Sequence, residues 1–259
     1  MQTWIRWRED VEREGMRFGP APEYKVFPER GDALAPYQAA VLAAQESRPL
    51  MREFDPHAVV ADILTTAAPL GAELEERRWA TLIPHVLPTP ERGFPPYSIG
   101  ARLPRTPVGA ALWRAMEPIV RLGVEQGREE LNGARRRVGL PELPWTHNGI
   151  SRELAIVATF PQLEYPRSSW EPWARVTGPL MWEQPFGEVE LPPGDAPLVL
   201  VAPSTSQDPK QRMLRAALEG LADEPVRVIA TTNRRGYPVP SAPANARVVD
   251  WLSYARTMP

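Results

Sequence analysis

The chain has 259 residues, of which 43% are hydrophobic and 24% charged, enough apolar material for two domains of ordinary size. A formal net charge of −2 gives no electrostatic argument for binding nucleic acid or an anionic membrane. The absence of cysteine excludes disulfides, thiolate metal ligands and a cysteine nucleophile. No apolar run approaches the roughly 18 residues of a membrane span, and the charged amino terminus is unlike a signal peptide. We therefore expect a cytoplasmic protein.

The first part of the chain alternates between helical and strand patterns. Apolar residues at helical spacing predict helices over residues 4–14 and 34–45. The short apolar segments Ala58–Asp62 and 79–83 are typical of strands, and residues 67–77 between them form a third helical pattern. This alternation predicts a parallel sheet with helices on both faces.

A proline-rich connection, a long helix and a domain boundary follow. Residues 84–107 lack a regular pattern; loops of this length often line a binding site, and an ordered surface excursion is the alternative. Residues 108–138 predict a long helix with a kink at Pro118. Prolines and glycines then gather in residues 180–197. We expect an N-terminal domain over residues 1–180, a linker over 181–197 and a C-terminal domain over 198–259.

The C-terminal domain opens with a strand, a polar loop and a helix. The apolar run 198–202 predicts a strand buried on both faces, and Asp208 followed by Pro209 predicts the start of the helix. Such units place backbone N–H groups at the carboxyl edge of a parallel sheet, where phosphate groups bind. An α/β unit without a ligand is the alternative, because no glycine-rich fingerprint is present. Two further strands are expected, over 226–231 and 246–249.

This arrangement looks incomplete at both ends. Its first element is a helix with no strand before it. Its last domain would have three parallel strands and one full helix, which leaves apolar surface and an unpaired edge exposed. We therefore expect further chain, or self-association through the C-terminal sheet, to complete it.

Four segments together resemble the bacterial UDP-glycosyltransferase-like family of GT-B fold, which includes macrolide and glycopeptide glycosyltransferases. They are DPHAVVADILTTAAPLGAELEERRWATLIPH (residues 55–85), VTGPLMWE (176–183), PLVLVAPSTSQDP (197–209) and NARVVDWLSYARTMP (245–259). Their order and spacing carry the resemblance. It implies an α/β fold of two Rossmann-like domains, the first lacking its initial strand and the second incomplete after three strands.

The resemblance also implies a reaction. The first domain would hold a small lipophilic acceptor and the second a nucleotide-sugar, with UDP or dTDP as the nucleotide. A hexose would pass to the acceptor hydroxyl with inversion at the anomeric carbon. No metal and no cofactor beyond the nucleotide-sugar co-substrate is implied.

Individual positions match the family's site residues. Asp62 matches the aspartate that steadies the family's base histidine, a pairing that fixes the tautomer of the imidazole and raises its basicity. Ser204 and Thr205 match groups near the donor diphosphate, and Trp251 matches the aromatic residue that packs against the donor base. For Asp62 a turn-forming role is the alternative, and for Trp251 the alternative is a place in the core.

The family's base histidine and its His-Gly-Gly segment have no counterpart in this chain. The histidines present, His57, His85 and His147, fall elsewhere. His85, at the mouth of the long loop, is either an acceptor contact or a structural histidine. We therefore expect no transfer by this chain alone. A non-catalytic relative that binds a small ligand, or acts as a partner subunit, remains the alternative.

Overall fold

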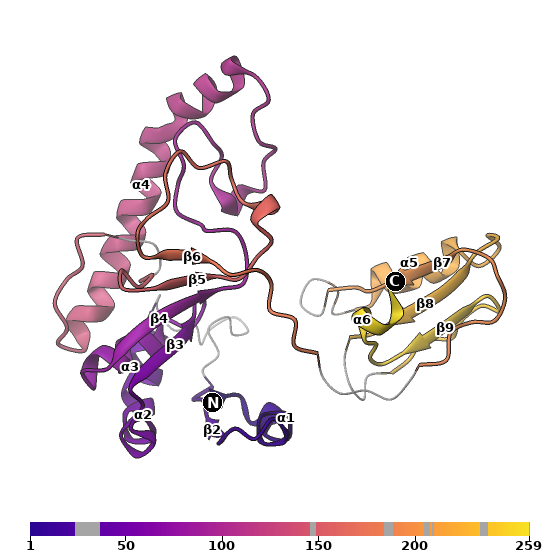
Figure 1. Cartoon of the computed structure of the whole chain (residues 1–259), viewed down its shortest axis with the longest axis horizontal. Coiled ribbons are helices and arrows are strands. Elements are labelled where there is room, and N and C mark those ends of the chain that lie inside the picture. Colours follow the sequence, from indigo (N-terminus) through magenta and orange to yellow (C-terminus); the bar gives the residue numbers. More distant parts are fainter. Residues whose placement is uncertain are drawn as a thin grey trace. The chain divides into compact units, whose positions relative to one another are not determined.

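The computed structural model describes residues 1–23, 37–145, 149–183, 189–204, 208, 210–233 and 238–258 (Figure 1). The chain divides into two compact units, Met1–Met181 and Trp182–Pro259. Each unit contains a parallel sheet with its own hydrophobic core.

The first unit is built on a four-stranded sheet in the order β3-β4-β5-β6, with every neighbouring pair parallel. Its strands are β3 (Ala58–Asp62), β4 (Arg78–Ile83), β5 (Ala155–Val157) and β6 (Ala174–Val176). Because all four run the same way, their carboxyl ends share one edge of the sheet. The predicted parallel α/β architecture is confirmed.

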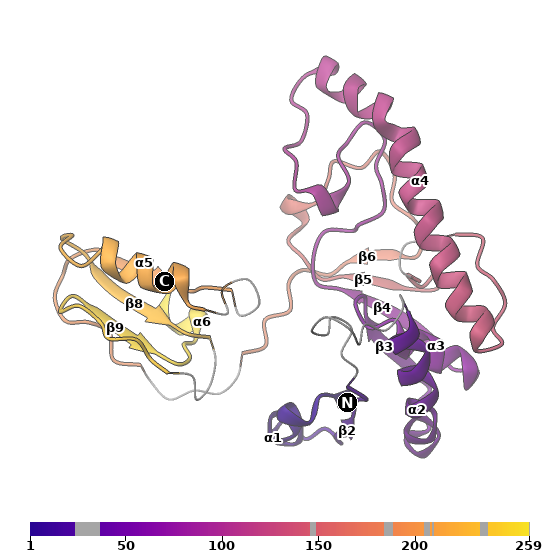
Figure 2. The ribbon, with the colours of Figure 1, turned by 180° about the vertical axis from the view of Figure 1, so that it is seen from behind.

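Three helices accompany this sheet (Figures 1 and 2). The helix α2 (Gln38–Phe54) packs along α3 (Ala67–Leu74), which connects β3 to β4. The prediction ended α2 near residue 45, but the helix continues through Pro49 to Phe54 and ends at Asp55, whose φ is +46°.

The third helix, α4 (Pro107–Arg137), runs past the sheet and projects beyond it (Figure 2). Its start follows from the sequence, since Thr106 accepts a hydrogen bond from the Gly109 N–H at 3.1 Å and Pro107 occupies the first helical position. Pro118 lies inside the helix, as expected.

The proline-rich connection after β4 is an ordered loop that contains the short helix η2 (Tyr97–Ile99). The side chain of Arg167, 3% exposed, holds it by donating to the carbonyl oxygens of Leu87 and of Thr89. Glu164, next to the short helix η3 (Pro161–Leu163), accepts from the Leu87 N–H at 2.7 Å. These buried contacts fix the loop as one wall of the unit.

The amino-terminal segment differs from the prediction. A two-residue strand, β1 (Gln2–Thr3), precedes the helical turns η1 (Ile5–Trp7) and α1 (Arg8–Arg13), so the first element is not a helix. It pairs with β2 (Gly19–Pro20), because the Gly19 N–H donates to the Met1 carbonyl and the Ala21 N–H to the Thr3 carbonyl.

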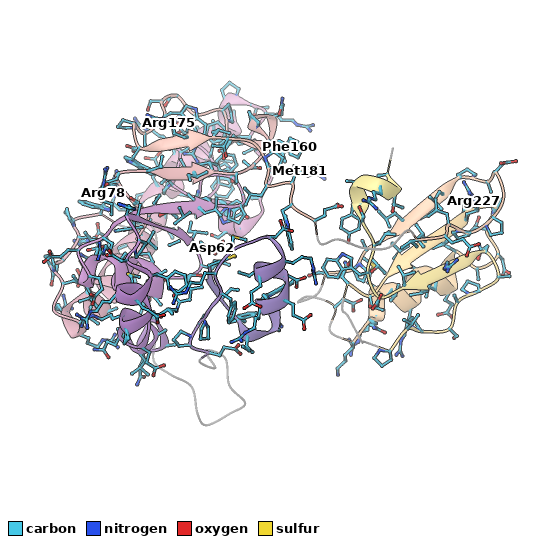
Figure 3. All side chains as sticks on the ribbon, turned by 60° about the horizontal axis from the view of Figure 1, so that its bottom comes forward. Asp62, Arg78, Phe160, Arg175, Met181 and Arg227 are labelled. Atoms are coloured by element: carbon cyan, nitrogen blue, oxygen red, sulfur yellow. The ribbon has the colours of Figure 1, made fainter. Side chains whose placement is uncertain are left out.

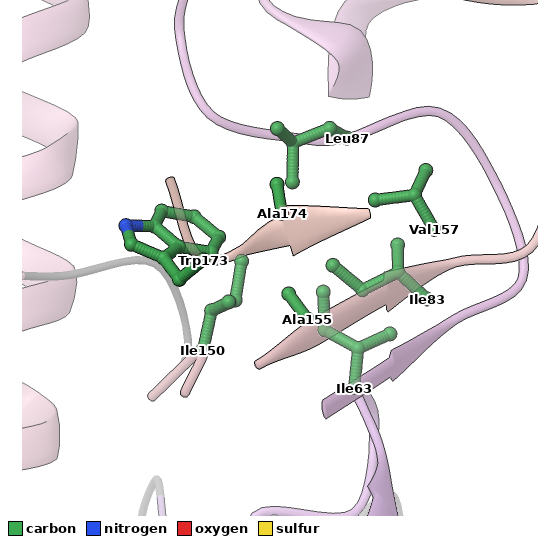
Figure 4. Close-up of a cluster of buried hydrophobic side chains, with 8 residues drawn as sticks. All are labelled: Ile63, Ile83, Leu87, Ile150, Ala155, Val157, Trp173 and Ala174. Carbon is green, nitrogen blue, oxygen red and sulfur yellow. The ribbon is translucent and has the colours of Figure 1, made fainter. Parts of the chain in front are cut away.

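The core of the first unit forms where the sheet meets the loop after β4 (Figure 4). Ile83 and Val157, from neighbouring strands, are fully buried, and Leu87 folds back onto them. Trp173 closes the cluster with 6% of its surface exposed and turns its ring nitrogen away from the other seven side chains.

The second unit is a three-stranded parallel sheet in the order β7-β8-β9. Its elements are β7 (Leu198–Val201), α5 (Arg212–Gly220), β8 (Arg227–Thr231), β9 (Ala246–Val249) and α6 (Tyr254–Thr257). Leu214 and Leu218 of α5 pack onto Val228 and Ala230 of β8. The first three residues of β7 are only half-buried, so the expectation of a strand buried on both faces is wrong here.

Candidate functional site

Polar residues follow the strands of the first unit at their carboxyl edge. Asp62 ends β3, and His85 comes two residues after β4. Figure 3 shows Asp62 and Phe160 toward one edge of the sheet and Arg78, the first residue of β4, toward the opposite edge. In parallel α/β sheets ligands bind outside the carboxyl edge.

Asp62 is engaged in a turn. Its Oδ1 accepts a hydrogen bond from the Leu64 N–H at 2.9 Å, and its carbonyl oxygen accepts from the Thr65 N–H at 2.8 Å. This is the geometry of an Asx turn, which starts the connection to α3. In this chain the carboxylate of Asp62 therefore stabilises the strand-to-helix turn.

His85 is half-buried and is oriented by two neighbours. Its Nδ1 lies 2.8 Å from the Val86 carbonyl oxygen, which can only accept, so Nδ1 carries a proton. In the neutral ring the lone pair is then on Nε2. The imidazole stacks on Tyr97, with ring centroids 4.7 Å apart and planes inclined by 12°.

A groove of about 640 Å³ opens beside this ring pair. One wall carries Leu64, His85 and Tyr97, and the other is the side of α4 that presents Met116 and Ile119. Its lining contains no carboxylate, lysine or arginine. We call this cavity the α4 groove. Met116 and Ile119 are 42% and 60% exposed, so the apolar stripe of α4 lines this groove.

The other predicted positions in the first unit do not join this groove. His57 is exposed and precedes β3, at the end of the strand opposite Asp62. His147 lies outside the described residues. Arg135, in the last turn of α4, is buried and forms a bidentate ion pair with Glu73, at 2.7 and 2.9 Å.

In the second unit, Asn233 joins the segments that follow the three strands. Its Nδ2 donates to the Pro203 carbonyl after β7 at 2.9 Å, and its Oδ1 accepts from the Tyr254 hydroxyl at 2.9 Å. Ser204 is exposed next to Pro203, and Trp251 is half-buried two residues after β9. Asn233 thus brings the segments of Ser204 and Trp251 to one edge. The sequence analysis missed it; its signal is a polar Thr-Thr-Asn run directly after a buried strand.

Glu183 forms hydrogen bonds with the start of α6. It accepts from the Ser253 hydroxyl and from the Ala255 N–H, so it stabilises the first turn of α6. These hydrogen bonds, that from Ser253 first, hold the pKa of the Glu183 carboxyl below its ordinary value.

The helix after β7 begins later than predicted. The first residue of α5 is Arg212, and Gln211 precedes it with φ of +53°. The Asp208 carboxylate accepts from the N–H groups of Arg212 at 2.7 Å and Met213 at 3.0 Å. The Asp208 carboxylate thus accepts the first N–H groups of α5, as expected of an acid at the start of a helix. Thr205 lies outside the described residues, so its predicted donor contact does too.

Within the described residues, no group of three or more His, Asp or Glu side chains could hold a metal ion. Over the same ranges, no helix is long and apolar enough to cross a membrane.

The sequence is similar to those of bacterial glycosyltransferases. No family model matches the sequence. A region of 145 residues, 51% of this chain, is 32% identical to 4'-demethylrebeccamycin synthase of Lentzea aerocolonigenes and covers 33% of that protein. A region of 130 residues is 32% identical to a PGL/p-HBAD biosynthesis glycosyltransferase of Mycobacterium tuberculosis, covering 47% of this chain and 29% of that protein. The matched regions thus span about a third of each relative.

Solved structures share the fold over nearly the whole chain. The glycotransferase of kitacinnamycin superimposes with a TM-score of 0.60 at 17% identity, covering 97% of this chain and 63% of that one. The calicheamicin glycosyltransferase CalG4 does so with a TM-score of 0.57 at 16% identity, covering 97% and 62%. SsfS6 of Streptomyces sp. SF2575, complexed with thymidine diphosphate, gives 0.51 at 14% identity, covering 96% and 63%.

At these identities the structures establish the fold, and the curated relatives carry the sequence link. The chain spans less than two thirds of the length of each of these proteins. The order of its parallel strands and helices, its sequence similarity and its fold all point to the same group of proteins. The chain is thus similar to bacterial GT-B glycosyltransferases, in sequence over about half of its length and in fold over nearly all of it.

Proposed function

We propose that this chain forms part of an inverting glycosyltransferase that moves a hexose from a UDP- or dTDP-sugar to a hydroxyl of a small lipophilic acceptor. The observation that carries the proposal is the α4 groove at the carboxyl edge of the first sheet. The crystallisation of SsfS6 with thymidine diphosphate supports the donor class.

The groove suits a lipophilic acceptor. Its volume of about 640 Å³ lies within the usual range of small-molecule sites, about 300–1,000 Å³. The stacked rings of His85 and Tyr97 provide a flat aromatic wall, and Met116 provides a soft one that adapts to ligand shape. A charged acceptor would lose its hydration without gaining an ion pair, so we expect a neutral one.

In the proposed reaction the acceptor oxygen forms a bond to the anomeric carbon. The bond from that carbon to the diphosphate breaks, and the nucleoside diphosphate leaves. A base takes the hydroxyl proton. We assign Nε2 of His85 as the group that accepts a hydrogen bond from the hydroxyl of the acceptor substrate and so orients that hydroxyl. Ser204 and Trp251 are assigned to binding of the nucleotide-sugar. The family resemblance gives the base to a histidine that these 259 residues lack.

The acceptor role is tested with a flat polyphenol, quercetin, titrated into the 259-residue chain. We expect Ile119→Glu to weaken binding at least about ten-fold, because it places a carboxylate against the ligand in an apolar groove. Leu122→Glu is the matched control. It lies on the same helix and is 71% exposed, but it does not line the groove. Equal affinities of the two variants for quercetin would show that the α4 groove is not the acceptor site.

The same preparation tests transfer. With UDP-glucose or dTDP-glucose and quercetin we expect binding without product, because the base assigned by resemblance is not in the chain. Product formation would contradict this expectation, and loss of that product in His85→Gln would then assign the base to His85.

A second candidate, a non-catalytic ligand-binding or partner subunit, is favoured by one observation. The carboxylates of Asp62 and Asp208, both near the expected sites, are used by the chain's own backbone. The intact mass of the protein from its natural source discriminates: a mass well above 29.0 kDa favours the transferase. A mass near that value, with sedimentation that depends on concentration, favours a subunit that self-associates through the C-terminal sheet.

A further inference from the structure

A second cavity, of about 320 Å³, adjoins the α4 groove and shares Pro90 and Val124 with it. Unlike the groove, it is lined by aromatic and charged side chains. Trp145, Arg152, Glu171 and Trp173 come from the segments that precede β5 and β6. We call it the tryptophan cavity.

Side chains that line this cavity carry hydrogen-bond donors without an acceptor in the described part of the chain. The indole nitrogens of Trp145 and Trp173 are both buried and have no hydrogen-bond partner within the described ranges. An indole N–H can only donate, and a buried donor without an acceptor is destabilising. Trp173 directs its nitrogen away from the hydrophobic core, as Figure 4 shows.

The third donor is the guanidinium of Arg152. It lies 5.2 Å from the ring centroid of Trp145 and 5.0 Å from that of Trp173, so the two indoles hold it by cation–π contacts. Its nearest carboxylate is Glu171, at 3.8 Å, beyond hydrogen-bond distance. In the described part of the chain the N–H groups of Arg152 thus have a charge nearby but no acceptor.

The remaining charged side chains leave Arg152 as the group that recognises a ligand. Arg128 is occupied by Glu125, with which it forms two hydrogen bonds from Nε and Nη2. Glu171 is 49% exposed and only loosely paired, so it can turn into solvent. Val124, Ile150 and Pro90 supply apolar walls. A ligand that fits combines acceptor oxygens with a compact apolar body.

We propose that the tryptophan cavity binds a small organic carboxylate. One carboxylate has enough lone pairs to accept from Arg152 and from both indole N–H groups, and charge-assisted bonds of this kind are the strong ones. The volume of about 320 Å³ accommodates a single ring. This site goes beyond the proposed function and does not depend on glycosyl transfer.

Benzoate is the probe, and the indole N–H signals of the ¹⁵N-labelled chain are the readout. The chain has nine tryptophans, whose signals are assigned with Trp→Phe variants. We expect benzoate to shift the signals of Trp145 and Trp173 saturably and to leave the others in place. Benzamide, of the same shape without the charge, should bind at least about ten-fold more weakly.

Arg152→Gln should weaken benzoate binding at least about ten-fold, whereas Arg102→Gln, at an exposed position outside the cavity, should not. Trp173→Phe keeps the packing ring but removes one donor, so it should weaken binding several-fold. The unchanged remainder of the spectrum verifies folding of each variant. If the two signals do not move, or move equally in Arg152→Gln, the cavity holds only water and the proposal is wrong.

Discussion

The carboxylates of two aspartates, Asp62 and Asp208, accept hydrogen bonds from backbone N–H groups where one element ends or the next begins. Asp62 ends a strand and Asp208 precedes a helix, positions at which acids often contact ligands. In both cases the carboxylate accepts N–H groups that would otherwise lack partners, those of Leu64 and of Arg212 and Met213. For Asp62, spacing along the chain cannot separate a catalytic role from a turn-forming one, because both require a short acid at the end of a strand. For Asp208, the sequence predicted the start of the helix.

Replacing Asp208 should loosen the start of α5. In Asp208→Ala the first N–H groups of the helix lose their acceptor, which costs about 1 kcal/mol, or about five-fold in the local exchange rate. Hydrogen exchange of the peptide covering residues 210–220 measures this. Asp223→Ala, an exposed aspartate after the helix, is the control and should leave that exchange unchanged. Equal protection in both variants would show that the carboxylate does not cap α5.

At the scale of elements, an ion-pair cluster clamps α2 to the end of α3. Glu75 follows α3 and has 10% of its side chain exposed. Its oxygens accept from Arg52, at 2.6 and 2.8 Å, and from Arg48 at 2.5 Å, both on α2. The hydrogen bonds from Arg52 and then Arg48 lower the pKa of Glu75 from 4.5 to about 2.

This lowered pKa predicts a pH dependence of stability. Because the carboxyl binds its proton less readily when folded, the unfolded chain protonates first as the pH falls below about 4.5. The stabilisation is therefore present above that pH and is lost as the pH approaches about 2. In urea titrations, Glu75→Gln should be less stable than the parent at pH 6, and the two should converge toward about pH 2.

Glu76→Gln serves as the control, since Glu76 is exposed and adjoins Glu75. It should follow the parent at every pH. If Glu75→Gln and the parent keep a constant difference from pH 6 to pH 2, the ion-pair cluster does not account for the acid sensitivity.

At the scale of the whole molecule, the chain forms two compact units that meet along the chain at residue 181. Each sheet has its own apolar cluster: Ile83 and Val157 belong to one, Leu214 and Val228 to the other. Leu180, Met181 and Trp182 at the boundary are 60%, 74% and 54% exposed. A protease that cleaves after large apolar residues can therefore reach this exposed segment.

Brief treatment with chymotrypsin should therefore cut first next to Leu180, Met181 or Trp182. Mass spectrometry of the first two fragments locates the cut. Leu64 and Leu163, at 82% and 63% exposure, are the internal comparison, because the surrounding structure holds them in a turn and a short helix. An earliest cut at either of those leucines would argue against the division of the chain into these two units.

The sequence by itself determined the order and type of the main elements. The run Ala58–Asp62 matches its strand to the residue, and the helix expected over residues 108–138 is α4 (Pro107–Arg137), because apolar periodicity is a local property. It missed the strand pairing of Gln2 with Gly19, since two-residue strands carry no periodic signal.

Only the tertiary structure decided what those elements do. The stripe of α4 with Met116 and Ile119 has the same spacing whether it faces a core or an open groove, and the neighbouring loop makes it a groove wall. Likewise, nothing in the sequence pairs Trp145 with Trp173 or places Arg152 between them. Apolar spacing identifies which face of an element avoids water, but the partner of that face depends on segments far away in the chain.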